Sequence, residues 1–530
     1  MKILFVYPDF TLDIDPATKR FLALEEGGWY MEGLASMSAV LKEKGHDVAL
    51  YHIIRPVDRD AFTLRLQREQ PDLVGFTTGT RSFPFVKEYA RWVKDTLDVP
   101  IICGGYHPDS FPEEVVAVPE IDIVSLGEGE ETLAELCDRL AEGRPYLDLA
   151  GAWVKADGEV VRNPSRLLIT DLDSMPLPDF ALFDFDQLIG TAIGSGMAVL
   201  SRGCPYSCAY CINPRTRALY ANRKHYWRQR SPQRSVEYVE KLVSLRPELQ
   251  VIQFCSDMFG PNIPWLAKFS ELYKRKIARP FTCNHRVNLI TPELVRLLKD
   301  AGCYQIFLGI ESGNDHIRNR VLNRHLSRES IVRAFRLCAE AGIRTVAYNM
   351  IGVPFEDNRA VLDTIKLNAE ARADHSLCPV YYPFPGTKLF EGAVQHGFVP
   401  PSFDYREDRF LVQPTLPRSD LFFARYYFKL FVRAYRLAFR LPGPLRRLAE
   451  VVLDRVFLWR FLPRRPLTAL ARLWEKGFLA LKKVLRRYMP RLYMLGRNRL
   501  RGVSRAKARP SPATEEPPEQ VAVPPSEPTR

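Results

Sequence analysis

Three cysteines, Cys204, Cys208 and Cys211, lie close together in the stretch Cys-Pro-Tyr-Ser-Cys-Ala-Tyr-Cys. A short apolar run at residues 197–200 predicts a buried strand just before them, and a glycine and a proline then turn the chain into a loop. Three thiols on one loop can face one centre, and thiolates are good ligands for iron–sulfur clusters and zinc. No fourth cysteine is near, so one metal position would stay open.

The spacing Cys-x3-Cys-x2-Cys after a strand, with Tyr210 before the last thiol, resembles the motif of the radical S-adenosylmethionine (SAM) enzymes. The resemblance implies that Cys204, Cys208 and Cys211 hold a 4Fe-4S cluster and that SAM chelates its fourth iron. It also implies that an electron, from a donor such as flavodoxin or ferredoxin, cleaves SAM to a 5′-deoxyadenosyl radical. That radical would remove hydrogen from an unactivated carbon of a small-molecule substrate.

Residues 1–143 alternate strands with helices. Apolar runs predict strands at 2–7, 48–53, 72–77, 99–103 and 121–126, and helical spacing predicts helices at 33–44 and 85–97 and a further helix that ends at residue 140. Turns rich in glycine follow several of the strands. The pattern predicts an α/β fold with a doubly wound parallel sheet, whose ligands bind outside the carboxyl ends of the strands.

The turns at that edge resemble those of the cobalamin-binding domain that precedes many radical SAM domains. The matching pieces are Gly-Gly-x-His at residues 104–107 and Gly-Glu-Gly-Glu at residues 127–130. The resemblance implies cobalamin contacts at Thr78, Gly104, Gly105, His107, Gly127, Glu128 and Gly129. The Asp-x-His-x-x-Gly signature of His-ligated cobalamin is absent, so the lower ligand of the cobalt stays open. A sheet that has lost its cofactor is the alternative.

A connector over residues 144–196, which includes a small hairpin, leads to a second alternation of strands and helices. Strands with their following turns are expected at 197–200, 249–254, 281–287, 306–313, 347–356 and 378–387. Residues 197–400 are therefore predicted to form a partial (β/α)6 barrel, in which the active groups come from the C-terminal ends of the strands.

Resemblance to the radical SAM family implies SAM contacts at several of these strand ends. Asp257 would meet the SAM amino group or the substrate, and Arg286 would face SAM. Glu311, in a Gly-x-Glu-Ser-Gly turn, would accept hydrogen bonds from the SAM hydroxyls, and Ser312 would bind the carboxylate end. Gly352, in a Gly-x-Pro-x-Glu turn, is the last of the expected cofactor-binding residues in this domain.

The cysteines outside the motif are scattered singly along the predicted barrel. A lone cysteine among apolar residues is most often a small core residue. This interpretation applies to Cys255, Cys283, Cys303, Cys338 and Cys378. Cys255 is the one worth testing as a functional thiol, because it lies beside Asp257.

The region 401–500 is basic and has no strand pattern. Between Ser419 and Leu500, 20 Lys and Arg oppose four Asp and Glu, a net charge of +16 in a chain whose total is +13. Residues 421–441 read as a basic amphipathic helix, which predicts contact with an anionic membrane surface through 421–491. A helical domain packed on the barrel and an RNA contact are the alternatives. Residues 501–530 read as a disordered tail.

The combined features predict a cobalamin-dependent radical SAM enzyme, with C-methylation as the leading function. The substrate radical would take the methyl group of methylcobalamin, and a second SAM would then remethylate the cobalamin. The alternatives are an oxidoreductase or cyclase that acts on a tetrapyrrole or lipid, a non-catalytic cobalamin or redox sensor, and an RNA modifier. The absence of a signal peptide pattern and of a long apolar run predicts a cytoplasmic location. The basic region makes a membrane-borne, lipid-like substrate more attractive.

Overall fold

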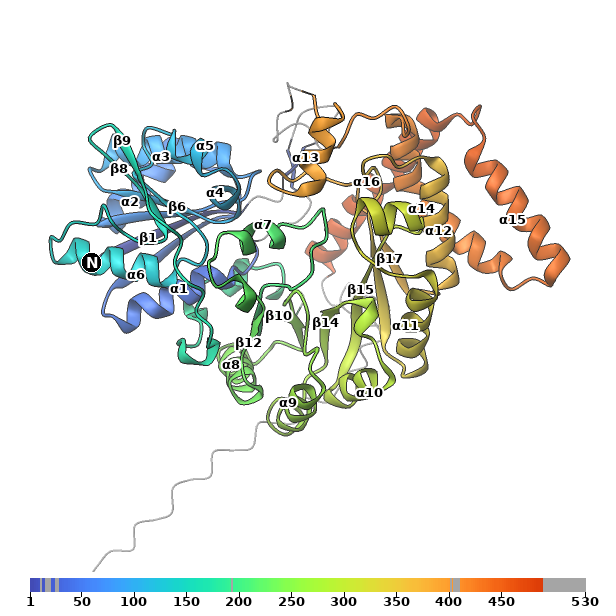
Figure 1. Cartoon of the computed structure of the whole chain (residues 1–530), viewed down its shortest axis with the longest axis horizontal. Helices are drawn as coiled ribbons and strands as arrows, with labels where there is room; N and C mark the ends of the chain where they lie inside the picture. Colours follow the sequence, from blue (N-terminus) through green and yellow to red (C-terminus); the bar gives the residue numbers. More distant parts are fainter. Residues whose placement is uncertain are drawn as a thin grey trace, which may run out of the picture. The chain divides into compact units, whose positions relative to one another are not determined.

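The structure is a computed structural model that describes residues 1–9, 12–14, 21–23, 28–191, 194–400, 403 and 410–489. The chain divides into two compact units, Met1–Thr468 and Ala469–Arg530. The first unit contains two large sheets (Figure 1) and two small sheets of two strands each. The predicted disordered tail, residues 501–530, lies outside the described residues.

The N-terminal sheet is the doubly wound parallel sheet that the sequence predicts. Its parallel strands are β1 (Lys2–Pro8), β4 (Asp47–Ile53), β5 (Leu73–Thr77), β6 (Ile101–Gly104) and β7 (Ile123–Ser125). Helices α1 (Glu32–Glu43) and α6 (Glu130–Ala141) cover one face, and α2 (Arg59–Glu69), α3 (Phe83–Thr96) and α5 (Pro112–Val116) cover the other. The strand order reverses between β1 and β5, so the switch point at which such sheets bind ligands lies at the carboxyl ends of these strands.

The hairpin predicted in the connector belongs to this sheet. Strands β8 (Ala152–Ala156) and β9 (Glu159–Arg162) are antiparallel, and β8 pairs with β7. The complete order is β4-β1-β5-β6-β7-β8-β9. The hairpin therefore covers the edge of β7 that would otherwise be open. Farther along the connector, Phe180 and Phe183 pack against Tyr30 and join the apolar core of this domain to that of the barrel.

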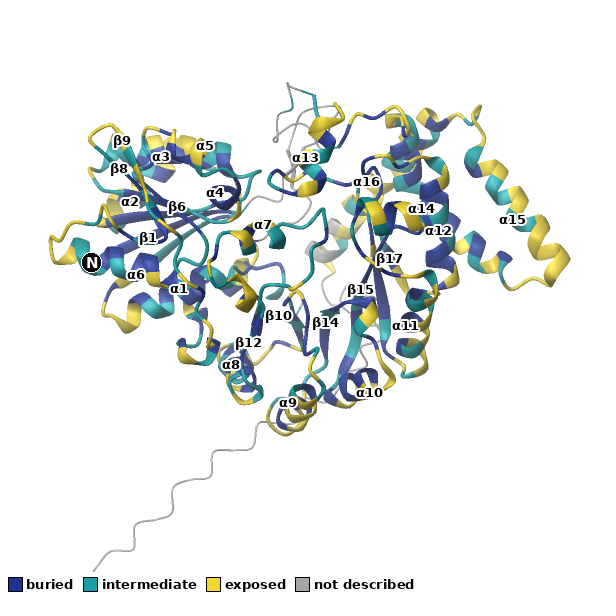
Figure 2. Cartoon of the chain, viewed as in Figure 1, coloured by how far each residue is buried: buried dark blue, intermediate teal, exposed yellow. Residues whose placement is uncertain are grey.

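The second sheet is the open, six-stranded parallel sheet expected of a partial (β/α)6 barrel. Its order, β10-β13-β14-β15-β16-β17, follows the chain. The strands are β10 (Ser195–Ala198), β13 (Val251–Phe254), β14 (Phe281–His285), β15 (Cys303–Glu311), β16 (Arg344–Asn349) and β17 (His375–Leu377). The outer helices are α8 (Pro232–Leu245), α9 (Ile263–Lys276), α10 (Pro292–Ala301), α11 (Arg328–Glu340) and α12 (Asn358–Glu370). Figure 2 shows the buried strands inside and the exposed sides of the helices outside.

One strand prediction was wrong. The sixth strand was expected over residues 378–387, but β17 covers His375–Leu377 and ends where the predicted range begins. The predicted range has three prolines, which cannot donate to a strand ladder. It forms a turn that leads to α13 (Lys388–Gln395), with one isolated pairing between Val380 and Ile351.

The basic C-terminal helices are α14 (Arg418–Ala438), α15 (Gly443–Leu458) and α16 (Arg464–Tyr488). The apolar side of α14 packs on α12 and α15, with Leu421, Phe423, Phe428, Phe431 and Tyr435 buried. The predicted membrane-facing helix, 421–441, thus has its apolar side covered by protein, because α12 supplies a complementary apolar surface. Within the described residues, no helix combines the length and apolarity needed to cross a bilayer.

Candidate active site

The cysteine loop runs from β11 (Ser201–Arg202) to α7 (Asn213–Ala218). At Gly203, where φ is 76°, a side chain would collide with the carbonyl oxygen of Tyr226, so only glycine fits this turn. Cys208 is buried, and Cys204 and Cys211 are partly exposed. Burial raises the pKa of Cys204 to about 11 and also raises the pKa of Cys211. Iron binding would displace these protons.

The loop has features that fit an iron–sulfur cluster. The backbone N–H and the side-chain amide of Asn213 both donate to Cys211 Sγ at 3.5 Å. Hydrogen bonds of this kind to cysteine sulfur are among the features that set the properties of such clusters. Among the described residues, no three His, Cys, Asp or Glu side chains are grouped as a single-ion site. The loop supplies three thiols, and hydrogen-bond donors of Asn213 lie next to the sulfur of Cys211.

A second segment, Leu322–Arg324, holds the cysteine loop from the side. Ala209 N donates to the carbonyl oxygen of Leu322 at 3.1 Å, and Asn323 Nδ2 donates to that of Ser207 at 2.6 Å. Arg324 Nη1 lies 3.7 Å from Cys208 Sγ. The backbone at Cys208 is thus fixed on both sides by residues from the loop that follows β15.

Arg324 also connects the cysteine loop to Glu311. Tyr210 Oη donates to Glu311 Oε1 at 3.1 Å, Arg324 Nη1 donates to Tyr210 Oη at 3.1 Å, and Arg324 Nη2 lies 4.0 Å from Glu311 Oε1. Burial raises the pKa of Glu311, whereas Arg324 and Tyr210 act to lower it. Glu311 has a φ of 67°, an uncommon conformation for a non-glycine residue that turns its carboxyl group toward the cysteine loop.

Arg286 lies against the same loop. Its guanidinium stacks on Tyr206, 3.8 Å from the ring centroid, and Nη1 donates to Cys208 Sγ at 3.4 Å. It also donates to Asn288 Oδ1 at 2.8 Å and to the carbonyl oxygen of Arg324. Two guanidinium groups, those of Arg286 and Arg324, therefore face one thiol.

Ser312 lies away from this group. It is fully buried, its hydroxyl is 3.5 Å from Thr364 Oγ1 on α12, and it accepts from Asn314 N at 3.3 Å. Its side chain stabilises the turn after β15 in this structure. The predicted contact with the carboxylate end of SAM stays a prediction.

The turn after β16 contains Gly352, with a φ of 81°, and the fully buried Glu356. Gly352 N donates to Glu356 Oε2 at 2.5 Å, so the carboxyl group fixes the turn. Burial raises the pKa of Glu356 to about 8, because few groups compensate the desolvation of its charge.

Replacing Glu356 with Gln should change the pH dependence of stability. The unfolded chain ionises this residue near pH 4.5 and the folded chain near pH 8, so native stability falls as the pH rises through this window. The Gln variant lacks that loss of stability. Its free energy of unfolding should exceed that of the parent by roughly 2–4 kcal/mol at pH 9, with little difference at pH 4. Denaturant unfolding at several pH values measures this. Glu340→Gln, on an exposed side chain, is the control, and parallel curves for parent and E356Q would contradict the prediction.

Asp257 and Cys255 follow β13 and lie at the mouth of the barrel. Asn213, which contacts Cys211, also donates to Asp257 Oδ2 at 3.1 Å. Desolvation raises the pKa of Asp257 although its side chain is exposed. Burial raises the pKa of Cys255 to about 12, so its thiol is protonated and unsuited to act as a nucleophile.

Helix α4 (Tyr106–Ser110) of the N-terminal domain packs on α7, which directly follows the cysteine loop. Arg215 Nη2 on α7 donates to the carbonyl oxygen of Ser110 at 3.4 Å. The side chain of Tyr106 is 61% exposed, and desolvation together with Asp257, Asp109 and Cys211 raises its pKa to about 12. The carboxyl edge of the N-terminal sheet therefore faces the cysteine loop.

The glycine turn beside Tyr106 is closely packed against β5. Gly105 has a φ of 110°, and a side chain there would approach the carbonyl oxygen of Thr78 to 2.7 Å. Thr78 N donates to the carbonyl oxygen of Gly104 at 3.0 Å. The two turns thus form one backbone surface without bulky side chains, which fits the approach of a large planar cofactor.

His107 lies beneath that surface. Its ring packs on Phe83 at 4.2 Å and near Phe111, and it is 1% exposed. Burial, with a smaller effect of Lys87, lowers the pKa of His107 to about 4, so the ring is neutral. Its Nε2 has no hydrogen-bond partner among the described residues. The ring contacts protein in this structure, and a cobalamin contact stays a prediction.

The Gly-Glu-Gly-Glu turn contacts the barrel domain in this structure, and its predicted cobalamin contacts stay a prediction. Glu128 makes a bidentate pair with Arg228, at 2.6 and 3.0 Å, and Glu130 pairs with Arg202 at 2.5 Å. Gly127 N donates to Asp109 Oδ1 at 2.7 Å, and Glu128 N donates to Tyr220 Oη at 2.7 Å.

The two glycines of that turn allow close approach. At Gly127, where φ is 80°, a side chain would collide with Tyr220, and at Gly129 it would come within 2.8 Å of Met37 Sδ. Glycine is thus required here by protein packing alone, without a cofactor. Arg202 comes two residues before Cys204, so this contact ties the N-terminal domain directly to the cysteine loop.

Sequence reasoning missed Arg324, Tyr220 and Arg228 as site residues. Each contacts a motif residue that is distant in the chain, and none belongs to a recognisable motif of its own. Tyr210 carried a signal, since it is the aromatic residue before the last motif cysteine, but its bond to Glu311 was not foreseen.

Two family models match the chain. The Radical SAM superfamily model matches residues 198–367, and the B12 binding domain model matches residues 26–137. An uncharacterized methyltransferase of Pyrococcus horikoshii is 27% identical over 371 residues, which cover 69% of this chain and 79% of the relative. The anaerobic magnesium-protoporphyrin IX monomethyl ester cyclase of Cereibacter sphaeroides is 26% identical over 79% of this chain and 67% of its own length.

A solved structure shares the fold of nearly the whole chain. It is the cobalamin-dependent SAM radical enzyme OxsB with aqua-cobalamin and SAM bound, at a TM-score of 0.64 and 15% identity. The match covers 91% of this chain and 75% of that chain. The domain order and the cysteine loop agree with both family models. This chain is an enzyme of the radical SAM superfamily with a B12 binding domain, and its cofactors are a 4Fe-4S cluster, SAM and cobalamin.

Proposed function

We propose that the chain is a C-methyltransferase, which joins a methyl group to an unactivated carbon of a small molecule. The observation that carries the proposal is the packing of α4, at the carboxyl edge of the N-terminal sheet, on α7, which directly follows the cysteine loop; Arg215 Nη2 donates to the carbonyl oxygen of Ser110 at 3.4 Å. A methyl donor bound at that edge would lie close to a radical generated at the cysteine loop. The Pyrococcus horikoshii relative supports the same reaction class.

When bound, the cluster and SAM supply the hydrogen-abstracting radical, and cobalamin supplies the methyl group. Cys204, Cys208 and Cys211 would hold the iron. Glu311, which Tyr210 and Arg324 contact, would accept hydrogen bonds from the SAM hydroxyls, and Asp257 would accept from its amino group. The backbone of Thr78, Gly104 and Gly105 would lie against the cobalamin ring.

The reaction class can be tested without a known substrate. The full chain would be reconstituted anaerobically with iron, sulfide and hydroxocobalamin, reduced, and supplied with SAM. A methyltransferase should form S-adenosylhomocysteine as SAM methylates the cobalamin, together with 5′-deoxyadenosine from radical cleavage. Deoxyadenosine without S-adenosylhomocysteine would contradict methyl transfer and favour an oxidoreductase or cyclase, which the Cereibacter sphaeroides relative supports. Neither product from a fully loaded protein would favour a sensor.

We further propose that the substrate is lipid-like, and helix α15 supports this proposal better than α14 does. Helix α15 exposes Leu445, Leu448, Val452 and Val456 at helical spacing, and Trp459 follows at its end. The exposed fractions lie between 42% and 62%, and the same helix bears three arginines, Arg446, Arg447 and Arg455. An apolar stripe with basic flanks is typical of helices that lie in a membrane interface.

Replacing Leu448 and Val452 with Glu should reduce binding to anionic phospholipid vesicles at least about tenfold. Each change removes apolar area that would be buried in the membrane, and it adds a negative charge that the anionic lipids repel. Cosedimentation with such vesicles measures the effect. The matched control is Arg333→Gln with Arg296→Gln, which makes the same change of net charge at two exposed positions on outer barrel helices. Equal binding by parent and L448E/V452E would remove the support for a membrane-borne substrate.

A further inference from the structure

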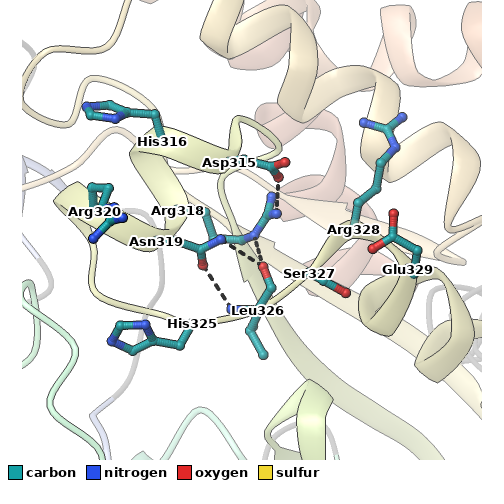
Figure 3. A pocket seen from close by; sticks show the side chains of 10 residues that line it. All are labelled: Asp315, His316, Arg318, Asn319, Arg320, His325, Leu326, Ser327, Arg328 and Glu329. Carbon is teal, nitrogen blue, oxygen red and sulfur yellow. Dashed lines mark hydrogen bonds and ion pairs between the residues drawn. The ribbon is translucent and has the colours of Figure 1, made fainter.

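The surface beside the cysteine loop contains a hollow of about 620 Å³ (Figure 3). It is formed by the segment that follows β15, residues 315–329. Figure 3 shows His316, Arg320 and His325 along one side of the hollow, and all three side chains are exposed. Arg320 has no ion pair with any residue that the structure describes. This side of the hollow is therefore a basic surface without internal compensation.

The segment is held in an unusual shape by one buried cation. Arg318 is fully buried, and it donates to the carbonyl oxygens of Leu326 at 2.9 Å and Ser312 at 3.0 Å, and also to Asp315. Residues 317–321 form a π-helical turn, and Asn323 and His325 have φ values of 56° and 53°. Such irregular backbone is common at functional sites. Arg318 fixes it so that the neighbouring side chains point outward.

The same segment is adjacent to the cluster ligands. Asn323 Nδ2 is bonded to the carbonyl oxygen of Ser207, the residue before Cys208, and Arg324 approaches Cys208 Sγ. His325 follows directly in the chain and is exposed. The exposed His325 is therefore next in the chain to a residue that contacts a cysteine of the motif.

Two further basic residues extend this surface around the loop. Arg217 donates to the carbonyl oxygen of Pro205 and to Ser207 Oγ, both at 2.8 Å, on the opposite side of Ser207 from Asn323. Lys388 is exposed at the start of α13, next to Leu389, whose N–H donates to the carbonyl oxygen of Ala209 at 2.9 Å. We call Arg217, His316, Arg320, His325 and Lys388 the basic rim.

We propose that the basic rim is the docking surface for an acidic one-electron carrier protein. The inference rests on the family assignment, which places the cluster at Cys204, Cys208 and Cys211. SAM cleavage needs one electron per event, and the carrier loses one electron as the cluster gains one, with no covalent bond formed. Positive charge beside the cysteine loop would attract an acidic carrier and orient it for transfer.

The test is the rate at which reduced flavodoxin, an acidic flavoprotein, reduces the cluster in the reconstituted full chain. Arg320→Glu with Lys388→Glu should slow this reduction at least about tenfold at low ionic strength, and the difference from the parent should shrink as salt is added. Anaerobic stopped-flow absorbance of the cluster measures the rate. Dithionite, a small reductant that needs no docking surface, should reduce both proteins equally fast.

Arg296→Glu with Arg333→Glu is the matched control, since it reverses two exposed charges on α10 and α11, away from the loop. This variant should match the parent with flavodoxin. An unchanged flavodoxin rate in the rim variant, an equal loss in the control, or a parallel loss with dithionite would each overturn the proposal. The experiment uses no methyl acceptor, so its outcome is independent of whether the chain transfers methyl groups.

Discussion

Replacing Cys208 with Ala is expected to abolish SAM cleavage and to lower bound iron from about four atoms per chain to fewer than about one. Cys208 is the most buried of the three motif thiols and the one that both Arg286 and Arg324 approach, at 3.4 and 3.7 Å. Its loss removes one of three thiolates and leaves two guanidinium groups facing an apolar methyl group. Iron analysis and the yield of 5′-deoxyadenosine after anaerobic reconstitution measure the effect.

Cys255→Ala is the matched control, because Cys255 is a partly exposed thiol at the end of a neighbouring strand. It should retain the full iron content and deoxyadenosine yield, since its raised pKa keeps the thiol protonated and apart from the cluster. A Cys208→Ala protein with full iron would show that the cluster has another ligand set. Loss of iron in Cys255→Ala would place this fourth thiol in the site.

The fold was predictable because it depends on patterns that are local in the chain. The apolar runs at 2–7 and 48–53 correspond to β1 and β4, and the thiol spacing placed the cysteine loop correctly after the first barrel strand. The family models confirm the two domains that these patterns predict. The strand predicted at residues 378–387 was wrong, because the prolines in this range cannot donate the hydrogen bonds of a sheet. The strand forms just before this range.

The contacts that complete the site were not predictable, because they join residues that are far apart in the chain. Arg324 contacts Cys208 across 116 positions, and Glu128 contacts Arg228 across 100. The α14 prediction failed for a related reason. The basic amphipathic pattern of 421–441 indicates an apolar face but not which surface covers it, and here α12 does. Periodicity thus predicts that a face is buried, whereas the partner depends on the tertiary fold.

The Glu128–Arg228 pair provides the second large effect. Glu128→Gln should destabilise the protein by roughly 2–4 kcal/mol, because it leaves the buried Arg228 without its bidentate partner and also weakens the pairing with Arg202. Denaturant unfolding measures the change. Glu131→Gln is the matched control, because Glu131 is an exposed residue in the first turn of α6. The stability of this variant should stay within about 0.5 kcal/mol of the parent.

The same variant separates two explanations of the Gly-Glu-Gly-Glu turn. If the turn serves the interface between the domains, Glu128→Gln should lower stability and leave the affinity for aqua-cobalamin within about threefold of the parent, because the carboxylate faces arginines. If the turn contacts the cofactor, as the family resemblance implies, affinity should fall with little change in the unfolding of the cofactor-free protein. Titration with aqua-cobalamin, followed in the visible spectrum, distinguishes these results. The bidentate geometry at 2.6 and 3.0 Å and the collision that any side chain at Gly127 would make with Tyr220 favour the first outcome.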